Sequence, residues 1–289
     1  AYLKEHFPAE FMAAVISNEG GFYSPFAYVS EARRLGCTIL PLDVNVSEVR
    51  WRGKGRELRV GLLSIKGLSD DTQARIVATR AARPYRDLAD FLARVRPAED
   101  EARALIHARA FESLYPAAPQ AALLWTLTAT QRQATPKRRT GDLFEQRVSV
   151  APPPPPFAPE PPLDLLRREY AALGFLCDVH PMTLFADRLK RERLVKARDL
   201  GRYIGKRVRV ASFLITGKVV GTSKGEPMEF VTFEDETGIV ETTFFPDTYR
   251  RFCHLLDHHY PYILEGKIEE DFCAITLTVE RAELLANRP

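Results

Sequence analysis

The hydrophobic positions in the first part of the chain recur mainly at helical spacing. Apolar residues repeat every three or four positions over residues 2–16, a pattern typical of an amphipathic helix. Only Pro8 interrupts this stripe, and a proline fits the first turn of a second helix. Pro25 starts a further helix that Gly36 ends, and residues 62–115 return to several short helices. The pattern therefore predicts a largely helical N-terminal part.

Two other stretches alternate apolar and polar residues, as strands do. Residues 50–61 surround a glycine-rich turn and predict a small basic hairpin. From Lys206 onward the alternation predicts three strands, a helix that begins at Pro246, and two more strands. This order within about 80 residues is the plan of the OB-fold, a five-stranded β-barrel that often binds single strands. We therefore predict a multidomain α+β protein with a C-terminal OB-fold barrel.

The region between these parts is rich in proline. Residues 116–162 hold 11 of the 21 prolines, including the run Pro152–Pro156. Such a run favours a stiff polyproline II spacer. We interpret this stretch as an interdomain linker, with a helix resuming over residues 163–175.

The length of 289 residues accommodates about two domains with their own cores. No run of about 18 apolar residues and no leader is present, so we expect no membrane partner and a cytoplasmic location. The helical stripe already under way at Tyr2 suggests a fragment of a larger protein. The four cysteines lie far apart and form no C-x-x-C pair, which favours buried thiols over disulfides or a zinc ribbon.

The net charge of +3 conceals two regions of opposite sign. Residues 33–139 hold 20 basic and 11 acidic side chains, a balance of +9, whereas residues 206–289 hold 10 and 14, a balance of −4. A positive field attracts polyphosphate. A solvated helical surface is the alternative, and the charge alone does not decide between them.

The segment from Leu62 to Ser69 resembles a helix-hairpin-helix turn. Gly67 lets the backbone approach a DNA phosphate, and Lys66 adds a cation beside the amides of a helix N-terminus. Ser69 stands where a second glycine is usual, and two aspartates follow it, so an ordinary helix N-cap is the alternative. The DNA-binding candidates in this half are Arg59, Ser64, Lys66, Gly67, Ser69 and Arg75.

The linker contains one short apolar pair, Leu143-Phe144, in polar surroundings. An exposed pair of this kind is a plausible anchor in the pocket of a partner. Ligands of bacterial sliding clamps carry Leu-Phe after a glutamine, and here Thr140 stands in the place of the glutamine. A packed loop is the alternative.

Aromatic residues in the predicted barrel are candidates for base stacking, and about half of them must form the core because alternate strand positions face inward. These are Phe213, Phe230, Phe233, Phe244, Phe245 and Tyr262. Lys218 and Lys224 are expected on the loop between the first two strands, where they would meet the nucleic-acid backbone. The acidic balance of the barrel argues against strong single-strand binding.

No complete active site is evident. His254 and His258 would share a helix face, but a partly exposed helix end accounts for them better than a metal site. Glu234-Asp235-Glu236 is read as a turn between strands. We predict no catalytic residue, no metal ligand and no cofactor in this chain.

The residues taken together resemble the C-terminal half of the alpha subunit of bacterial DNA polymerase III. The resemblance covers almost the whole chain, and its most specific part is the barrel signature from Lys224 to Gly238. It rests on the segments Ala1–Lys4, Phe7–Ala14, Glu31–Gly36, Pro41–Asn45, Gly61–Gly67, Leu173–Phe175, His180-Pro181 and Lys224–Gly238. The segment Gly21–Pro25 is more similar to the error-prone branch of the family, and the replicative and error-prone subtypes both stay open.

This resemblance implies a division of the chain and a function. Its ranges are 1–35 for the end of the fingers region, 36–115 for a helix-hairpin-helix DNA-binding domain, 116–162 for the proline-rich linker, 163–204 for a helical connector and 205–289 for the OB-fold. The family's polymerase holds Mg²⁺ on paired aspartates of its palm, and no segment here matches that motif.

Two functions follow as hypotheses from this reading. In the first, residues 33–115 grip duplex DNA behind the primer terminus during replication or translesion synthesis, and the barrel lies near the single-stranded template. In the second, the chain recruits a sliding clamp or other replisome proteins, and DNA contact is incidental. A free-standing polymerase is not expected, because the palm is missing.

Overall fold

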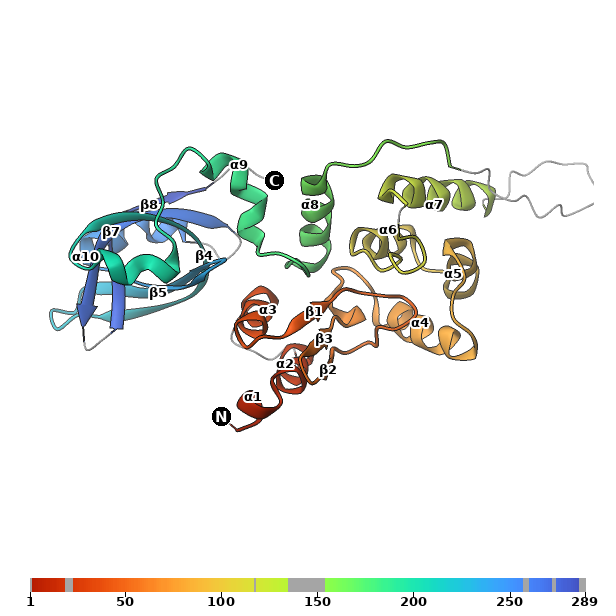
Figure 1. Ribbon diagram of the computed structural model, residues 1–289, viewed down its shortest axis with the longest axis horizontal. Coiled ribbons are helices and arrows are strands. Elements are labelled where there is room, and N and C mark those ends of the chain that lie inside the picture. Colours follow the sequence, from red (N-terminus) through yellow and green to blue (C-terminus); the bar gives the residue numbers. More distant parts are fainter. Residues whose placement is uncertain are drawn as a thin grey trace, which may run out of the picture. The chain divides into compact units, whose positions relative to one another are not determined.

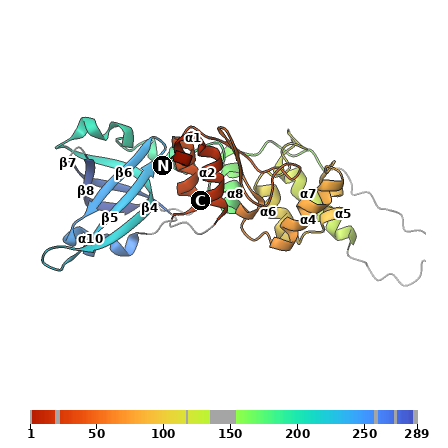
Figure 2. The same cartoon turned by 90° about the horizontal axis from the view of Figure 1, so that it is seen from below.

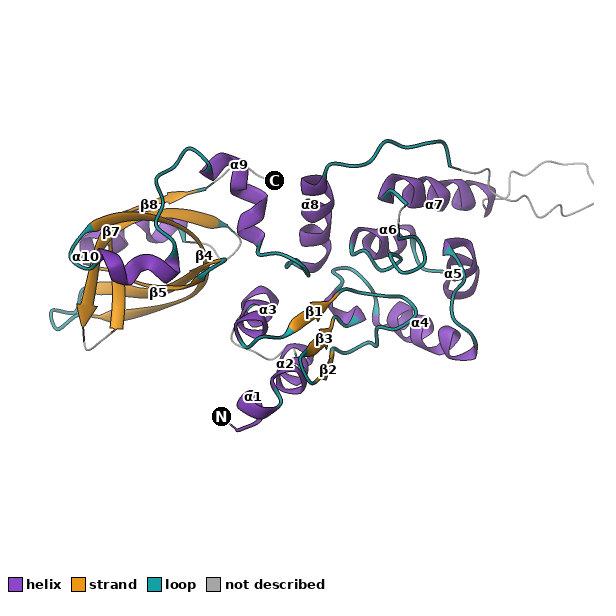
Figure 3. Ribbon diagram, viewed as in Figure 1, coloured by secondary structure: helices purple, strands orange, loops and turns teal. Residues whose placement is uncertain are grey.

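The computed structural model describes residues 2–18, 23–116, 118–134, 154–256, 260–271 and 274–285 (Figure 1). The chain folds as two compact units. The first unit is Ala1–Gly21 with Tyr28–Asp178, and the second is Phe22–Ala27 with Val179–Pro289. Most described helices lie in the first unit, whereas the long strands lie in the second (Figure 3).

The first unit begins with two short helices separated at a proline, α1 (Tyr2–His6) and α2 (Pro8–Ser17). Pro8 occupies the first turn of α2, where its missing N–H costs no helical hydrogen bond, so the predicted break is confirmed. Helix α3 (Pro25–Arg34) follows, and Gly36 leaves it with a φ of +78°. That left-handed conformation suits glycine, as the sequence predicts.

A small three-stranded sheet packs against α2. Its strands are β1 (Thr38–Leu40), β2 (Arg52–Lys54) and β3 (Glu57–Arg59), in the order β1-β3-β2. Strands β2 and β3 are antiparallel and join through Gly55, whose φ is +63°. The predicted hairpin with a glycine turn is therefore confirmed.

Short helices form the rest of this half, as the apolar spacing predicts. They are the 3₁₀ turn η1 (Leu62–Ser64) and the helices α4 (Asp70–Ala82), α5 (Leu88–Val95) and α6 (Glu99–His107). Three buried rings, Tyr85, Phe91 and Phe111, hold them together through edge-to-face contacts with centroids 5.0 Å apart. Aromatic pairs prefer this arrangement because the positive ring edge meets the negative ring face.

Two more helices complete the first unit, α7 (Gln120–Ala134) and α8 (Pro162–Leu173). Helix α8 was expected, but α7 corrects the reading of residues 116–162 as a linker without regular structure. The prolines of that stretch lie on either side of α7, and the window of the helix itself contains none. Leu123 and Leu127 of α7 are buried. The exact boundaries of the five expected ranges stay a prediction.

The second unit contains short helical elements and a closed β-barrel (Figure 2). The helical elements are η2 (Pro181–Phe185), α9 (Ala186–Leu189), η3 (Ala197–Tyr203), α10 (Pro246–Phe252) and η4 (Cys253–Leu255). The strands are β4 (Arg207–Gly221), β5 (Pro227–Asp235), β6 (Gly238–Phe244), β7 (Pro261–Asp271) and β8 (Ala274–Leu284). Three strands, a helix and two strands follow one another as predicted.

The barrel closes in the order β4-β5-β6-β8-β7, with all pairs antiparallel except β6 with β8. Closure leaves no free sheet edge. Alternate strand positions fill the interior, including Val210, Val231, Phe233, Phe244, Tyr262 and Leu264. The five-stranded OB-fold predicted from the sequence is therefore confirmed.

Candidate nucleic-acid interface

The predicted helix-hairpin-helix turn connects η1 to α4. Ile65 is extended, Gly67 has a φ of +80°, and Ser69 caps α4 by accepting a hydrogen bond from the N–H of Thr72 at 3.3 Å. A Cβ on Gly67 would meet nothing within 4 Å. Its N–H has no hydrogen-bond partner within the described part of the chain. This amide is therefore available to an external anion.

Lys66 has two roles in the turn. Its backbone N–H donates to the carbonyl of Ala172 at 2.9 Å, in the last turn of α8. Its Nζ would lie 3.3 Å from a Cβ placed on Gly174, the residue that caps α8. A cation at this end of a helix is favourable because the last carbonyls carry partial negative charge. Lys66 thus fastens α8 to the turn, while its side chain remains exposed.

The carboxylate of Glu101 occupies the N-terminus of α4. Its Oε1 accepts from the N–H of Ser69 at 3.0 Å and from the Ser69 hydroxyl at 2.6 Å. Its Oε2 accepts from the Thr72 hydroxyl at 2.8 Å and from the N–H of Ala98 at 2.9 Å. Burial alone would raise the pKa of Glu101, but these hydrogen bonds outweigh burial and lower it to about 2.

This internal anion changes the interpretation of Ser69. Both donors of Ser69 bond to Glu101, so they are not free for a phosphate in this conformation. The geometry agrees with the alternative of a helix N-cap. The sequence did not reveal this role of Glu101. The one available signal was that Glu101 is the third residue of α6, a position from which a glutamate bonds to the N–H of the residue before the helix, here Ala98.

Three other predicted residues of this half have internal partners. Arg75 donates to Val95 O and to the Thr72 hydroxyl, each at 2.9 Å, and pairs with Asp71. Ser64 accepts from the Nε1 of Trp51 at 2.7 Å. Arg59 donates one N–H to Pro41 O at 2.9 Å and has no carboxylate partner among the described residues. The groups still open to a ligand are therefore Arg59, Lys66 and Gly67.

The barrel separates the six candidate aromatics into core and surface. Phe213, Phe233, Phe244 and Tyr262 are almost completely buried, whereas Phe230 is 48% and Phe245 is 47% exposed. Lys218 is the register partner of Phe230 on the neighbouring strand. Register partners project to the same face of a sheet, so a cation lies beside the exposed ring.

The expected loop position of Lys218 is wrong, because β4 continues to Gly221. Lys224 does lie in the turn between β4 and β5, which the hydrogen bond from Thr222 N–H to Glu226 O closes at 2.9 Å. Both lysines are exposed.

The expectation of a turn for Glu234-Asp235-Glu236 is wrong for the first two residues, because Glu234 and Asp235 end β5 and only Glu236 lies in the turn before β6. Asp235 accepts from the N–H groups of Thr237 at 2.7 Å and of Gly238 at 3.1 Å. Glu234 is buried and lies 3.1 Å from the Nε2 of His180. Within the described ranges, no group of three or more His, Cys, Asp or Glu side chains could hold a metal ion. The clamp candidates Leu143 and Phe144, and the histidine His258, lie outside the described residues.

The two halves of the chain match models of two nucleic-acid-binding domain types. Residues 36–121 match the helix-hairpin-helix motif, and residues 213–285 match the OB-fold nucleic acid binding domain. The fold and these matches define a nucleic-acid-binding protein that combines both types in one chain. No helix among the described ranges has both the length and the apolar composition needed to cross a bilayer.

The chain is homologous to bacterial DNA polymerases over almost its entire length. It is 30% identical to the error-prone DNA polymerase of Rhodopirellula baltica and 28% identical to that of Symbiobacterium thermophilum, each over 99% of this chain. It is 28% identical to DNA polymerase III subunit alpha of Bacillus subtilis, also over 99% of this chain. The resemblance to this polymerase family is therefore confirmed. The chain spans about a quarter of the length of these relatives, 25% to 30%.

Proposed function

We propose that the chain is the DNA-holding part of a bacterial polymerase of the DNA polymerase III alpha type. Residues 33–115 grip the primer–template duplex behind the primer terminus, and the barrel contacts the single-stranded template. The observation that carries this proposal is the presence of a helix-hairpin-helix region and an OB-fold in one chain homologous to such polymerases. The polymerase acts in replication or in error-prone translesion synthesis.

Exposed groups without an internal partner, on both domains, support these separate roles for the two halves. On the helical half, the free N–H of Gly67 and the side chains of Lys66 and Arg59 offer contacts to phosphate. On the barrel, Phe230 and Lys218 offer a stacking surface beside a cation. Phosphate contacts fix the position of a duplex, and stacking accepts any base, so neither half needs to recognise sequence.

Salt-dependent binding of DNA tests the proposal directly. Fluorescence anisotropy of the whole chain is measured with a primer–template and with a single strand at several salt concentrations. Each phosphate contact adds about 0.9 to the negative slope of log affinity against log salt for duplex DNA. We expect a steep slope and a preference for the duplex. Weak binding to both probes at low salt would contradict the proposal.

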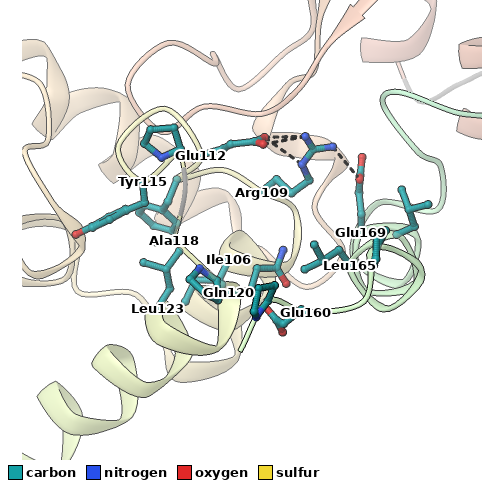
Figure 4. A pocket seen from close by; sticks show the side chains of 16 residues that line it. Ile106, Arg109, Glu112, Tyr115, Ala118, Gln120, Leu123, Glu160, Leu165 and Glu169 are labelled. Carbon is teal, nitrogen blue, oxygen red and sulfur yellow. Dashed lines mark hydrogen bonds and ion pairs between the residues drawn. The ribbon is translucent and has the colours of Figure 1, made fainter. Parts of the chain in front are cut away.

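A second candidate function is the recruitment of other proteins. The observation that favours it is a cavity of about 480 Å³ between α6, α7 and α8 of the first unit, with an apolar lining that includes Ile106, Leu123 and Leu165 (Figure 4). Apolar hollows of this size accept side chains of ligands or partners. The linker pair Leu143-Phe144 is the candidate for a sliding clamp.

Purified clamp tests this second candidate. Biolayer interferometry compares the chain with a variant that carries Leu143→Ala and Phe144→Ala. Loss of binding in the variant assigns clamp recruitment to the linker. Binding that stays at the level of the unchanged chain removes this role from Leu143 and Phe144.

The chain alone is not expected to extend a primer. The polymerase chemistry of the family uses Mg²⁺ held by palm carboxylates, and no segment of this sequence matches that motif. A primer-extension assay with the chain and Mg²⁺ checks this expectation.

A further inference from the structure

The hairpin formed by β2 and β3 has a face on which cations predominate. Arg52 and Lys54 of β2 are exposed, and neither has a hydrogen bond or an ion pair from its side chain within the described part of the chain. Among the described residues, the side chain of Arg59 in β3 bonds only to the carbonyl of Pro41. Glu57 is the one acidic residue on these two strands. Most cations elsewhere in this unit contact a carboxylate or several carbonyls, so the hairpin differs from its surroundings.

Strand alternation brings these side chains to one face. Leu58 is fully buried and pairs with Gly53, so this pair lies on the side that packs against α2. A Cβ on Gly53 would lie 2.1 Å from the carbonyl of Ala9, which shows how closely the strand approaches the helix. Successive residues of a strand point to opposite faces. The side chains of Arg52, Lys54, Glu57 and Arg59 therefore share the outer face.

Arg52 and Arg59 are direct register partners on this face. Like charges at directly opposite positions destabilise a sheet by a few tenths of a kcal/mol or more. No carboxylate compensates this pair among the described residues. Lys54 has Glu57 as its register partner, yet the two form no ion pair within 4 Å. The face thus concentrates positive charge for which the described part of the chain supplies no counterion.

The hairpin holds these cations on a fixed support. The Oε1 of Glu10 in α2 accepts from the N–H of Gly55 at 2.9 Å and so fastens the turn. At the same turn, Arg56 donates to the carbonyl of Leu35. These contacts fix the backbone that carries the cations, and the guanidinium groups of Arg52 and Arg59 match the oxygens of phosphate in a bidentate manner.

We propose that the outer face of the β2–β3 hairpin is a second phosphate-binding site for the nucleic-acid backbone, formed by Arg52, Lys54 and Arg59. This inference rests on the proposed function, because it takes the nucleic-acid ligand from it. It adds a site that is distinct from the Lys66–Gly67 turn. An acidic peptide offers carboxylates to the same face, and the experiment includes that outcome.

The test measures duplex affinity of the whole chain against salt for matched variants. The hairpin variant carries Arg52→Gln and Lys54→Gln, and the control carries Arg191→Gln and Arg193→Gln, which removes the same charge from exposed positions outside residues 33–115 and outside the barrel strands. We expect the hairpin variant to flatten the salt slope by about 1 to 2, at about 0.9 per lost phosphate contact. The control is expected to keep the slope of the unchanged chain. Arg59→Gln alone is expected to flatten it by about 1.

The possible outcomes separate this inference from the proposed function. If the unchanged chain binds neither duplex nor single strand, the proposed function fails and the inference fails with it. If the unchanged chain binds duplex and the hairpin variant keeps its slope, only the inference is overturned. If the control flattens the salt slope as much as the hairpin variant does, the inference is overturned as well, because the change in net charge would then explain the effect. A hairpin variant that loses binding to an acidic peptide but not to duplex would assign the face to a protein.

A second readout does not depend on variants. Acetylation of Lys54 by a small reagent is followed by mass spectrometry with and without duplex. We expect duplex to slow the acetylation of Lys54 in the unchanged chain. Equal rates under conditions where anisotropy shows saturation would contradict a contact at this face.

Discussion

The carboxylate of Glu101 receives both the hydroxyl and the N–H of Ser69, at 2.6 and 3.0 Å, although the two residues are 32 positions apart. Glu101 belongs to the first turn of α6 and Ser69 caps α4, so one side chain joins the beginnings of two helices. Anions are favoured at helix N-termini because unpaired N–H groups point outward there. Here the protein supplies its own anion.

Glu101→Gln is expected to destabilise the first unit by about 1.5–3 kcal/mol. Glu101 is only 7% exposed, and its two carboxylate oxygens accept four hydrogen bonds. In glutamine an NH₂ group replaces one of these oxygens, and it cannot accept the hydrogen bonds that the oxygen accepted. Urea unfolding followed by circular dichroism measures the change. Glu99→Gln in the same turn is the control and should change stability by less than about 0.5 kcal/mol. Equal values for both variants would contradict the role of Glu101.

We expect the ionisation of the Glu101 carboxylate to make the stability of the first unit depend on pH. The pKa of Glu101 is lowered from 4.5 to about 2 in the folded chain. A group with a depressed folded pKa stabilises the protein above its unfolded pKa and loses this effect as the pH falls towards its folded pKa. We therefore expect the stability difference between the chain and Glu101→Gln to be constant above about pH 5 and to shrink between about pH 4.5 and 2. A difference that stays constant over this range would show that Glu101 does not titrate there.

Phe230→Ala is expected to weaken single-strand binding by about 1–3 kcal/mol, the usual effect of removing one stacked base. Phe245→Ala is a matched control, because Phe245 is equally exposed but caps α10 and is not a register partner of Lys218. Anisotropy with a labelled single strand gives both affinities. Equal losses in the two variants would remove the special role of the ring beside Lys218.

Arg109→Met is expected to destabilise the first unit by about 3 kcal/mol. Figure 4 shows Arg109 with Glu112 and Glu169, to which it pairs at 2.8 and 3.3 Å. Arg109 also pairs with Asp178 at 2.5 Å, and against the opposing effect of burial these partners raise the pKa of Arg109. Glu169 is 1% exposed, so the variant leaves a buried charge without its cation. Thermal unfolding checks the result.

Arg103→Met is the control for this change, because within the described ranges Arg103 pairs only with the exposed Glu99 on the same helix. Such surface pairs contribute about 0.3–0.5 kcal/mol. If Arg103→Met lowers the stability as much as Arg109→Met does, the removal of a charge, and not the buried Glu169, causes the destabilisation.

Most of the architecture could be predicted from local patterns. The break at Pro8, the hairpin around Gly55 and the order of the barrel elements each follow from residues close together in sequence. Helix α7 could not be predicted from composition, because the prolines around it dominate the stretch while its own 15 residues have none. The end of β4 was also missed, since Gly217 beside Lys218 is typical of a turn, whereas the strand continues through it to Gly221.

The sequence predicted which residue types form the candidate site. It did not predict which of their hydrogen-bonding groups remain without a partner inside the protein. The sequence alone identifies Lys66, Ser69 and Arg75 as polar side chains near a glycine turn. The tertiary structure engages Ser69 with Glu101 and Arg75 with Val95, and leaves Gly67 and the outer face of the hairpin open.

The sequence by itself determined most of the elements and the order of those that form the barrel, because helical and strand periods are properties of neighbouring residues. Only the tertiary structure decided which donors meet an internal acceptor and which remain for a ligand. The reason is that hydrogen-bond partners such as Glu101 and Ser69 come from distant segments, and a buried carboxylate is stable only where the fold brings enough donors to it.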